Sequence, residues 1–321
     1  MTGDAAPVID AVVTVGALTP AEAVVSELPP APPRPRRLVY LGTPEMAVPA
    51  LEALVAAGLD IALVVTRVDK RRGRGSELSP SPVKAAAERL GLPVAHSVDA
   101  ALAAEADLGV VVAFGQLIRR HILEALPMVN LHFSLLPRWR GAAPVERALM
   151  AGDTETGVCL MRLEEGLDTG GIYARTVVPI GPTTTAADLR RDLVDVGTGL
   201  LVEQLAAGLG DPVDQVGDAT YAAKLDPAEF QIDWSHPAVV IDRLVRVGQA
   251  WTAFRGKRLK VLQTTPGESS GGMHGSIVGD VVTCGEGSLH LRRVQPEGKA
   301  PMMARDWANG ARPGPDERLG D

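Results

Sequence analysis

Cysteine, aromatic residues and long apolar runs are scarce in this chain, and each scarcity excludes a class of protein. Cys159 and Cys284 are the only cysteines among 321 residues, too few for a disulfide framework or a cysteine-based metal site. Aromatic residues make up 3% of the chain, so its cores must be built mainly from alanine, valine and leucine. No apolar run is long enough to cross a bilayer, and acidic residues interrupt the segment where a secretory signal would be apolar. We therefore expect a cytoplasmic protein without a membrane partner.

The remaining composition is that of a soluble globular protein. Hydrophobic residues are 46% of the chain and charged residues 22%, and the length allows two domains. The net charge of −7 does not by itself indicate a nucleic-acid partner. Five prolines lie between Pro29 and Pro35, and proline blocks helix and central strand alike. We predict that residues 1–36 form a disordered N-terminal extension.

Strand and helix patterns alternate after this extension. Apolar runs at 38–41, 61–66 and 108–114 are typical of buried strands, and 46–57 has a helical pattern that ends at a glycine. Strand, helix and strand at this spacing indicate right-handed crossovers and a parallel sheet. We predict a Rossmann-like, mostly parallel sheet with helices on both faces over residues 37–208. Gly42 stands alone after the first strand, so the glycine fingerprint of a nicotinamide dehydrogenase is missing.

A second, smaller domain is predicted after a linker at 209–228 that is rich in glycine, proline and aspartate. Short strands at 251–254, 258–263, 276–283 and 288–294, divided by glycine-containing turns, indicate a small antiparallel barrel over 229–305. Residues 251–305 carry eight basic and four acidic side chains on an otherwise acidic chain. This distribution fits contact with an RNA backbone, with a solvated surface as the alternative. We expect residues 306–321 to be a frayed tail.

The most basic local run, 67–75, carries five basic residues and one acidic residue, Asp69, and it contains two glycines. It has two interpretations: a solvated surface loop, or an arm that orders on the phosphates of an RNA.

One stretch around Asn130 and His132 carries the candidate chemistry. The sequence Asn130-Leu-His132 at a strand end places an amide donor and an imidazole on one face of the strand. Ser-Leu-Leu-Pro and Arg-Trp-Arg-Gly-Ala-Ala-Pro follow directly, and Leu-Asp168-Thr-Gly comes later in the chain. From the residues alone, Asn130 and His132 could instead satisfy buried backbone groups while Asp168 caps a turn.

These motifs resemble the folate-dependent formyltransferases from about Arg37 to about Met302. The resemblance implies transfer of the formyl group of 10-formyltetrahydrofolate to the amino group of methionyl initiator tRNA. It implies Asn130, His132 and Asp168 as catalytic residues, no metal, and an OB-like second domain that binds tRNA; we expect a monomer. The alternatives are a relative that formylates a sugar nucleotide or a purine precursor, and a non-catalytic RNA-binding protein. The stretch 118–120 departs from the family, where a proline is expected.

The resemblance also assigns the binding residues. Those expected to contact folate lie in two loops that follow strands: Phe114, Gly115, Gln116, Leu117, Ser134, Leu135, Leu136 and Pro137. Those expected to contact tRNA are basic residues of the 67–75 run and of the barrel: Arg67, Lys70, Arg71, Arg72, Arg74, Lys257, Arg258 and Lys260.

Overall fold

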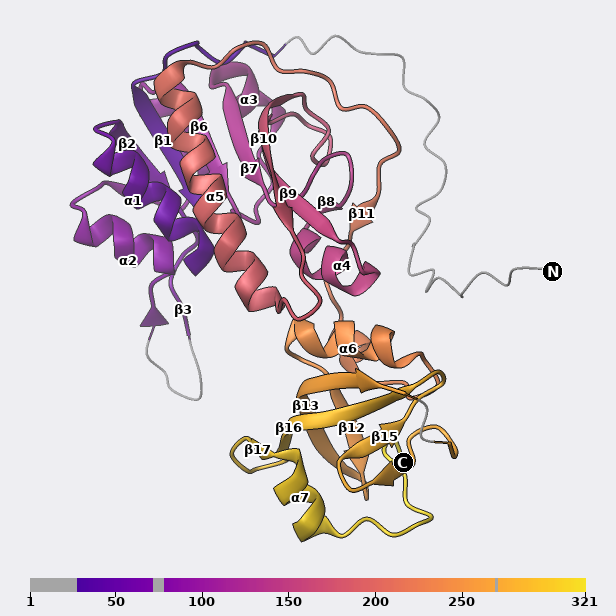
Figure 1. The fold of residues 1–321 in the computed structure, drawn as a ribbon. Coiled ribbons are helices and arrows are strands. Elements are labelled where there is room, and N and C mark those ends of the chain that lie inside the picture. Colours follow the sequence, from indigo (N-terminus) through magenta and orange to yellow (C-terminus); the bar gives the residue numbers. More distant parts are fainter. Residues whose placement is uncertain (1–27, 72–77, 269–270) are drawn as a thin grey trace, which may run out of the picture.

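Two large β-sheets, each with its own hydrophobic core, organise the computed structural model, which describes residues 28–71, 78–268 and 271–321 (Figure 1). Most of the predicted N-terminal extension lies outside the described residues. Its last part is tied to the first sheet: Leu28 packs against a core cluster, and the Arg162 guanidinium donates to the Leu28 carbonyl. The prediction of disorder as far as residue 36 is therefore wrong for residues 28–36.

The first sheet has seven strands in the order β10-β9-β7-β6-β1-β2-β5. Strands β9 and β10 pair antiparallel with their neighbours, and the other pairs are parallel. The mostly parallel sheet predicted from the apolar runs is confirmed. The bounds of its strands are β1 (Arg37–Gly42), β2 (Asp60–Val65), β5 (Val94–Ala95), β6 (Leu108–Val112), β7 (Met128–His132), β9 (Glu155–Arg162) and β10 (Ile172–Pro179).

Helices cover both faces of this sheet because its central strands are apolar on both sides. In β1, Leu38 and Tyr40 face one core while Val39 and Leu41 face the other. The helices on the first of these faces are α1 (Val48–Ala56), α2 (Pro82–Arg89) and α5 (Ala186–Ala207). The opposite face carries α3 (Arg120–Ala125) and the 3₁₀ helix η2 (Val98–Ala103).

The strand order creates a switch point between β1 and β6. From β1 the chain moves outward through β2 to β5, and it then returns to the other side of β1 with β6 and β7. The loops after β1, β6 and β7 therefore leave the same edge of the sheet in diverging directions. Ligands of open α/β sheets bind at such an edge, beyond the carboxyl ends of the strands.

The second sheet is antiparallel, as predicted, and runs in the order β12-β13-β16-β15-β14, with β17 paired to β16. Helix α6 (Ala238–Val247) packs on β13 and contributes to the core of this sheet. The bounds of the strands are β12 (Trp251–Phe254), β13 (Lys257–Gly267), β14 (Ile277–Val278), β15 (Val281–Thr283), β16 (Ser288–Pro296) and β17 (Met302–Met303).

The chain after Met303 is not a frayed tail, which corrects the prediction. It forms α7 (Ala304–Ala311), whose Trp307 packs edge-to-face on Phe254 with ring centroids 5.2 Å apart. Further on, Leu319 is buried in the core of the second sheet. Polar and charged residues surround these apolar side chains in the sequence, so no periodic pattern indicated the packing.

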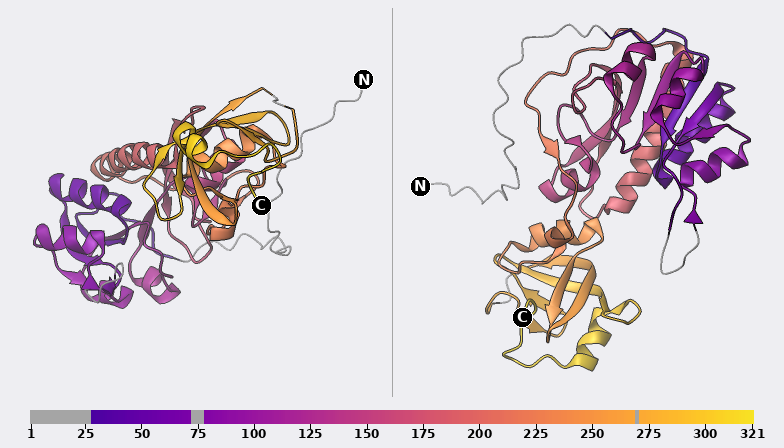
Figure 2. Two further views of the ribbon diagram at one scale, coloured as in Figure 1. Left: turned by 90° about the horizontal axis from the view of Figure 1, so that it is seen from below. Right: turned by 180° about the vertical axis from the view of Figure 1, so that it is seen from behind.

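Helix α4 (Pro144–Ala151) joins the two parts by packing on α6 (Figures 1 and 2). A small apolar cluster that includes Leu149 and Phe230 fills this joint. Beside it, the Arg147 guanidinium donates two hydrogen bonds to the Glu229 carboxylate, at 2.6 and 3.0 Å. This pair is bidentate and half-buried, which makes it geometrically specific and helps to fix how the two sheets meet.

Candidate active site

Strand β7 presents Asn130 and His132 on the face of the first sheet that is turned away from α5. Val129 and Leu131, which alternate with them along the strand, belong to the core beneath α1 and α5, so Asn130 and His132 point to the opposite side. The His132 side chain is buried, whereas that of Asn130 is half-buried. Asn130 and His132 therefore lie on one face of the sheet, at the carboxyl end of β7, as their spacing predicted.

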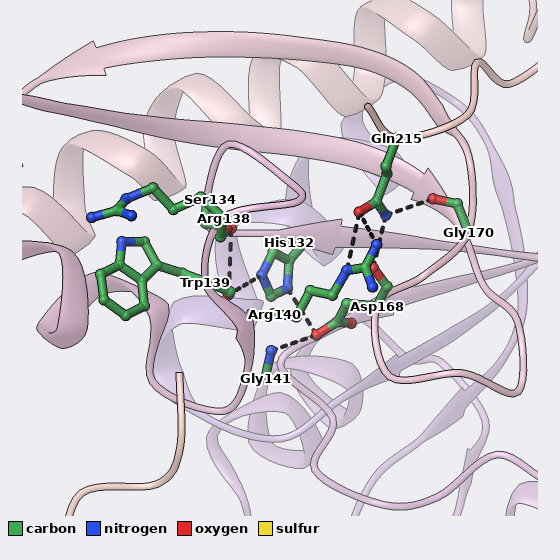
Figure 3. A network of polar contacts seen from close by, with 9 residues as sticks. All are labelled: His132, Ser134, Arg138, Trp139, Arg140, Gly141, Asp168, Gly170 and Gln215. Atoms are coloured by element: carbon green, nitrogen blue, oxygen red, sulfur yellow. Dashed lines mark hydrogen bonds and ion pairs between the residues drawn. The ribbon is translucent and has the colours of Figure 1, made fainter. Parts of the chain in front are cut away.

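The loop after β7 holds His132 in one tautomer. The backbone carbonyl of Trp139 lies 3.0 Å from Nε2 of His132, and a carbonyl can only accept (Figure 3). Nε2 therefore carries the proton in the neutral imidazole, and Nδ1 is left as the basic nitrogen. The Ser134 hydroxyl donates to the Arg138 carbonyl at 2.6 Å and closes the turn that delivers the Trp139 carbonyl. Nδ1 of His132, the nitrogen that can accept a proton, therefore lies on the side of the ring away from the Trp139 carbonyl.

Asp168 lies on that side. Its Oδ2 is 3.6 Å from Nδ1 of His132, and it accepts a hydrogen bond of 2.8 Å from the backbone N–H of Gly141 (Figure 3). The Asp168 backbone has a φ of 51°, a left-handed conformation that aspartate adopts more readily than most residues. The structure thus brings His132 and Asp168 together across 36 residues of sequence. An imidazolium formed at Nδ1 would face a carboxylate that is already oriented.

Of the three candidate catalytic side chains, that of Asn130 is the one without a partner among the described residues. This side chain makes no hydrogen bond to another residue in the described part of the chain, and it is open enough to meet a ligand. A carboxamide donates without titrating, so this position can stabilise negative charge at any pH at which the protein is folded. His132, Asp168 and Asn130 together supply a proton acceptor, an orienting carboxylate and a neutral donor.

A residue that the sequence did not single out completes the network. Gln215 donates from Nε2 to the carbonyls of Asp168 and Gly170, at 2.7 and 2.8 Å, and its Oε1 accepts two hydrogen bonds from Arg140 (Figure 3). It lies in the segment predicted as a linker, where composition alone indicates turns. No pattern in the sequence pointed to it, because its partners, two backbone carbonyls and the Arg140 guanidinium, lie far from it in the sequence.

The loop after β6, predicted to contact folate, leaves the sheet beside β7. Its Gly115 has a φ of 72°, and open space surrounds the position where a Cβ would lie. Gln116 is exposed and the Leu117 side chain is 79% exposed, while Phe114 is buried beneath them and its carbonyl accepts from the Thr43 hydroxyl at 3.2 Å. An exposed leucine beside open backbone is a surface that suits a flat ring with polar edges.

The second predicted folate loop is less open. Ser134 is fully buried and its hydroxyl is engaged within the loop, and Leu136 packs on Cys159 and Met161. Their side chains stabilise the protein, so only their backbone is left for a ligand. Leu135 and Pro137 are half-buried, and Leu135 lines a separate cavity of about 350 Å³ on the side of the loop to which the Arg138 and Trp139 side chains point.

Most of the described basic residues that were predicted to contact tRNA lie on two exposed surfaces. Lys70 and Arg71 form β3 (Lys70–Arg71), which pairs with β4 (Leu78–Ser79) in a short ribbon that projects from the first sheet (Figure 1). The only acid of this run, Asp69, is paired with Lys84 at 2.8 Å and so does not oppose them. Arg67 is half-buried and donates to the neighbouring carbonyl of Val68. Arg72 and Arg74 lie outside the described residues.

On the second sheet, Lys257, Arg258 and Lys260 are exposed on β13, while the intervening Leu259 is buried in the core. The Arg258 guanidinium stacks over the Trp251 ring at 4.3 Å, which holds that cation in a defined position.

Neither cysteine is available for chemistry. Both are buried, and burial raises the pKa of the Cys159 thiol to about 11 and that of Cys284 to about 12. Across residues 28–71, 78–268 and 271–321, no three histidine, cysteine, aspartate or glutamate side chains gather as metal ligands would. No helix in the same ranges combines the length and the apolar character needed to cross a membrane.

Gly141 is a residue of this site at which a side chain should not be tolerated. Its φ is 118°, and an added Cβ would lie 2.9 Å from the carbonyl oxygen of Ala222 in β11 (Tyr221–Ala222), which pairs with β8 (Arg140–Gly141). We expect Gly141→Ala to push the chain away from β11 and so misdirect the N–H that holds Asp168, lowering kcat by about 10². Steady-state kinetics measure this loss. Gly199→Ala is the control, because open space surrounds that position, and equal effects of both variants would contradict the argument.

Comparison with known proteins identifies the family. Residues 36–205 match the family Formyl transferase, and residues 224–312 match Formyl transferase, C-terminal domain. The methionyl-tRNA formyltransferase of Roseobacter denitrificans is 46% identical to this chain over 300 residues, which cover 86% of this chain and 96% of that protein. The methionyl-tRNA formyltransferase of Symbiobacterium thermophilum is 44% identical over 301 residues, covering 85% and 92%.

Two solved structures share the fold at low identity. An N-formyltransferase from Helicobacter canadensis, in complex with folinic acid and dTDP-3-aminofucose, matches with a TM-score of 0.62 at 17% identity, over 81% of this chain and 99% of that one. HypX from Aquifex aeolicus, in complex with tetrahydrofolic acid, matches with a TM-score of 0.59 at 15% identity, over 86% and 47%. Two family patterns in order along the chain, and relatives at 44% and 46% identity across most of its length, show that this protein is an enzyme of the formyl transferase family.

Proposed function

We propose that the protein transfers the formyl group of 10-formyltetrahydrofolate to the amino group of methionyl initiator tRNA, for translation initiation in the cytoplasm. The observation that carries the proposal is the arrangement of His132, Asp168 and Asn130 at the carboxyl edge of the sheet. The named relatives at 44% and 46% identity support the choice of substrate, because they match along almost their whole length.

The arrangement meets the needs of an acyl transfer. As the amine attacks the formyl carbon, negative charge develops on the formyl oxygen, and the Asn130 carboxamide can donate to it. The attacking amine must lose a proton, and Nδ1 of His132 is the nitrogen that can take it. The Asp168 carboxylate stabilises the imidazolium that results. The same proton then goes to the nitrogen of the donor from which the formyl group departs.

The edge of the sheet between β6 and β7 fits the donor. Asn130 lies on β7, beside the parallel strand β6 in which Val111 is paired with it, and the open backbone around Gly115 lies in the loop after β6. The exposed Leu117 side chain supplies an apolar surface beside them. We propose that 10-formyltetrahydrofolate binds here with its flat ring system against the 114–117 loop, so that its formyl group points toward His132. The donor supplies the activated formyl group, and no metal is required by the chemistry described.

A formylation assay with purified protein, 10-formyltetrahydrofolate and methionyl initiator tRNA tests the proposal. We expect N-formylmethionyl-tRNA as the product, and no formylation of a free amino sugar nucleotide at the same concentration. Formylation of the sugar nucleotide without transfer to tRNA would overturn the proposal in favour of the relative with a small-molecule acceptor. Tight tRNA binding without any transfer would favour the non-catalytic alternative. Sedimentation of the same sample tests the expected monomer.

The basic ribbon gives a separate prediction about the tRNA. We expect the double variant Lys70→Ser/Arg71→Ser to raise KM for tRNA by about tenfold with kcat changed less than about threefold, because phosphate contacts contribute to binding and not to the chemical step. The slope of log affinity against log salt should fall by about one for each phosphate that the variant no longer neutralises. Arg191→Ser, which removes an exposed cation of α5 that is paired with Asp188, should leave both quantities unchanged. An unchanged salt slope in the double variant would argue against tRNA binding at the ribbon.

A further inference from the structure

The segment that joins the two sheets crosses the active site before it reaches the second sheet. It begins after α5 and ends at β11 (Figure 1). Val213 exchanges two backbone hydrogen bonds with Ile172 at the start of β10, at 2.7 and 2.9 Å. At its other end, Thr220 accepts from the backbone N–H groups of Trp139 and Arg140, each at 2.9 Å. The segment is therefore attached on both sides of the catalytic loops, and Gln215 lies between these attachments.

We propose that Gln215 is a positioning residue for formyl transfer, which acts by holding the turn that carries Asp168. This inference rests on the proposed role of Asp168. The two N–H bonds of the Gln215 carboxamide hold two carbonyls, those of Asp168 and Gly170, at 2.7 and 2.8 Å. Both carbonyls belong to the tight turn that follows β9, in which a Cβ on Gly170 would lie 2.1 Å from the Arg162 carbonyl.

Arg140 determines which way the Gln215 carboxamide points. A guanidinium can only donate, and its Nε and Nη2 atoms lie 3.1 and 2.7 Å from Oε1 of Gln215. The oxygen of the carboxamide must face Arg140, so the nitrogen must face the two carbonyls. The contacts of Gln215 are therefore all satisfied in one orientation (Figure 3). Gln215 is itself half-buried, whereas Asp214 and Val216 on either side of it are exposed.

Asp168 is thus held at two ends. The Gly141 N–H fixes its carboxylate, and Gln215 fixes its carbonyl in the left-handed conformation with φ 51°. A non-glycine residue in that region persists only where its surroundings stabilise it. If Gln215 releases the carbonyl, the backbone can relax, and the carboxylate then turns away from Nδ1 of His132. Since transfer depends on near-ångström placement of the reacting groups, a small displacement is enough to slow it.

Two variants of Gln215 separate its two sets of hydrogen bonds. Gln215→Glu keeps an acceptor for Arg140 but loses both donors and places a carboxylate against two carbonyls. Gln215→Met removes both sets at similar volume. We expect both variants to lower kcat for formylation by about 10², with KM for folate and for tRNA within about threefold of wild type. Val216→Ala, a truncation of the exposed neighbour, is the matched control and should change neither constant.

A double-mutant cycle with Asp168→Ala tests whether Gln215 acts through Asp168. In the Asp168→Ala background we expect Gln215→Glu to cause no further loss, because a residue that acts only through another has no effect once that residue is gone. Independent, multiplying losses would overturn the proposal, and so would a loss confined to Gln215→Met, which would assign the effect to the Arg140 hydrogen bonds. Thermal unfolding of each variant must stay close to that of wild type, and a large decrease in Tm that accounts for the reduced activity would likewise overturn it. Failure of the wild-type protein to formylate methionyl-tRNA would instead refute the proposed function.

Discussion

Substitution of His132 is expected to cause the largest loss of activity in this protein. His132→Ala should lower kcat by about 10²–10⁴, which is the usual contribution of a positioned acid–base group. The physical reason is the arrangement of the ring: the Trp139 carbonyl fixes the proton on Nε2, so Nδ1 alone can accept the proton of the attacking amine. Single-turnover formylation with saturating folate and methionyl-tRNA measures this loss in the chemical step.

A second substitution at the same position separates proton transfer from structure. His132→Gln can still donate to the Trp139 carbonyl but cannot carry a proton, so it should lose as much activity as His132→Ala while keeping the Tm of the wild type. His121→Ala is the control, because this exposed histidine pairs with Asp99 on the surface and should be dispensable. Activity restored by glutamine would mean that His132 supports the loop and does not move the proton.

The second large effect is expected at Asn130. Asn130→Ala should lower kcat by about 10²–10³, the usual cost of removing one donor from the oxygen on which charge develops. Affinity for folate should change less than about threefold, because the hydrogen bond strengthens only as that charge forms. Comparison of kcat with the Kd for folate measures the two effects separately.

Asn130→Asp sharpens this test because the shape of the side chain is kept while its donor becomes a carboxylate. The variant should be at least as slow as Asn130→Ala. Asn309→Ala, at the other asparagine of the chain, is exposed on α7 and serves as the control. An Asn130→Asp protein with near wild-type turnover would show that no donor is needed at this position, and the proposed role of Asn130 would have to be abandoned.

Strands and helices were predictable wherever local pattern and packing agreed. The run 108–114 is apolar without alternation, which is typical of a strand covered on both faces, and β6 is such a strand. Helix α5 begins directly after Thr185, whose side chain forms a capping box with Asp188, so that side chain and backbone satisfy each other's donors locally. Such signals lie within a few residues of the structure that they determine.

The candidate site was predictable only in part, for the opposite reason. Asn130 and His132 are two residues apart on one strand, so their common face followed from the geometry of a strand. That Asp168 lies beside them depends on the pairing of β7 with β9 and on the turn beyond it, which strand geometry does not supply; the family resemblance alone had suggested it. Gln215 and α7 were missed because their partners, two carbonyls in one case and the Phe254 ring in the other, lie far away in the sequence.

The sequence by itself determined several strands of both sheets, the helix after the first strand, the two-part organisation and the motifs that place the chain among formyl transferases. Only the tertiary structure decided which nitrogen of His132 is basic, what holds Asp168 in place, and that a segment without any pattern crosses the active site. The physical reason is that hydrophobic periodicity and capping act over a few residues, whereas a catalytic arrangement is made by hydrogen bonds between chain segments that meet only after the sheet has formed.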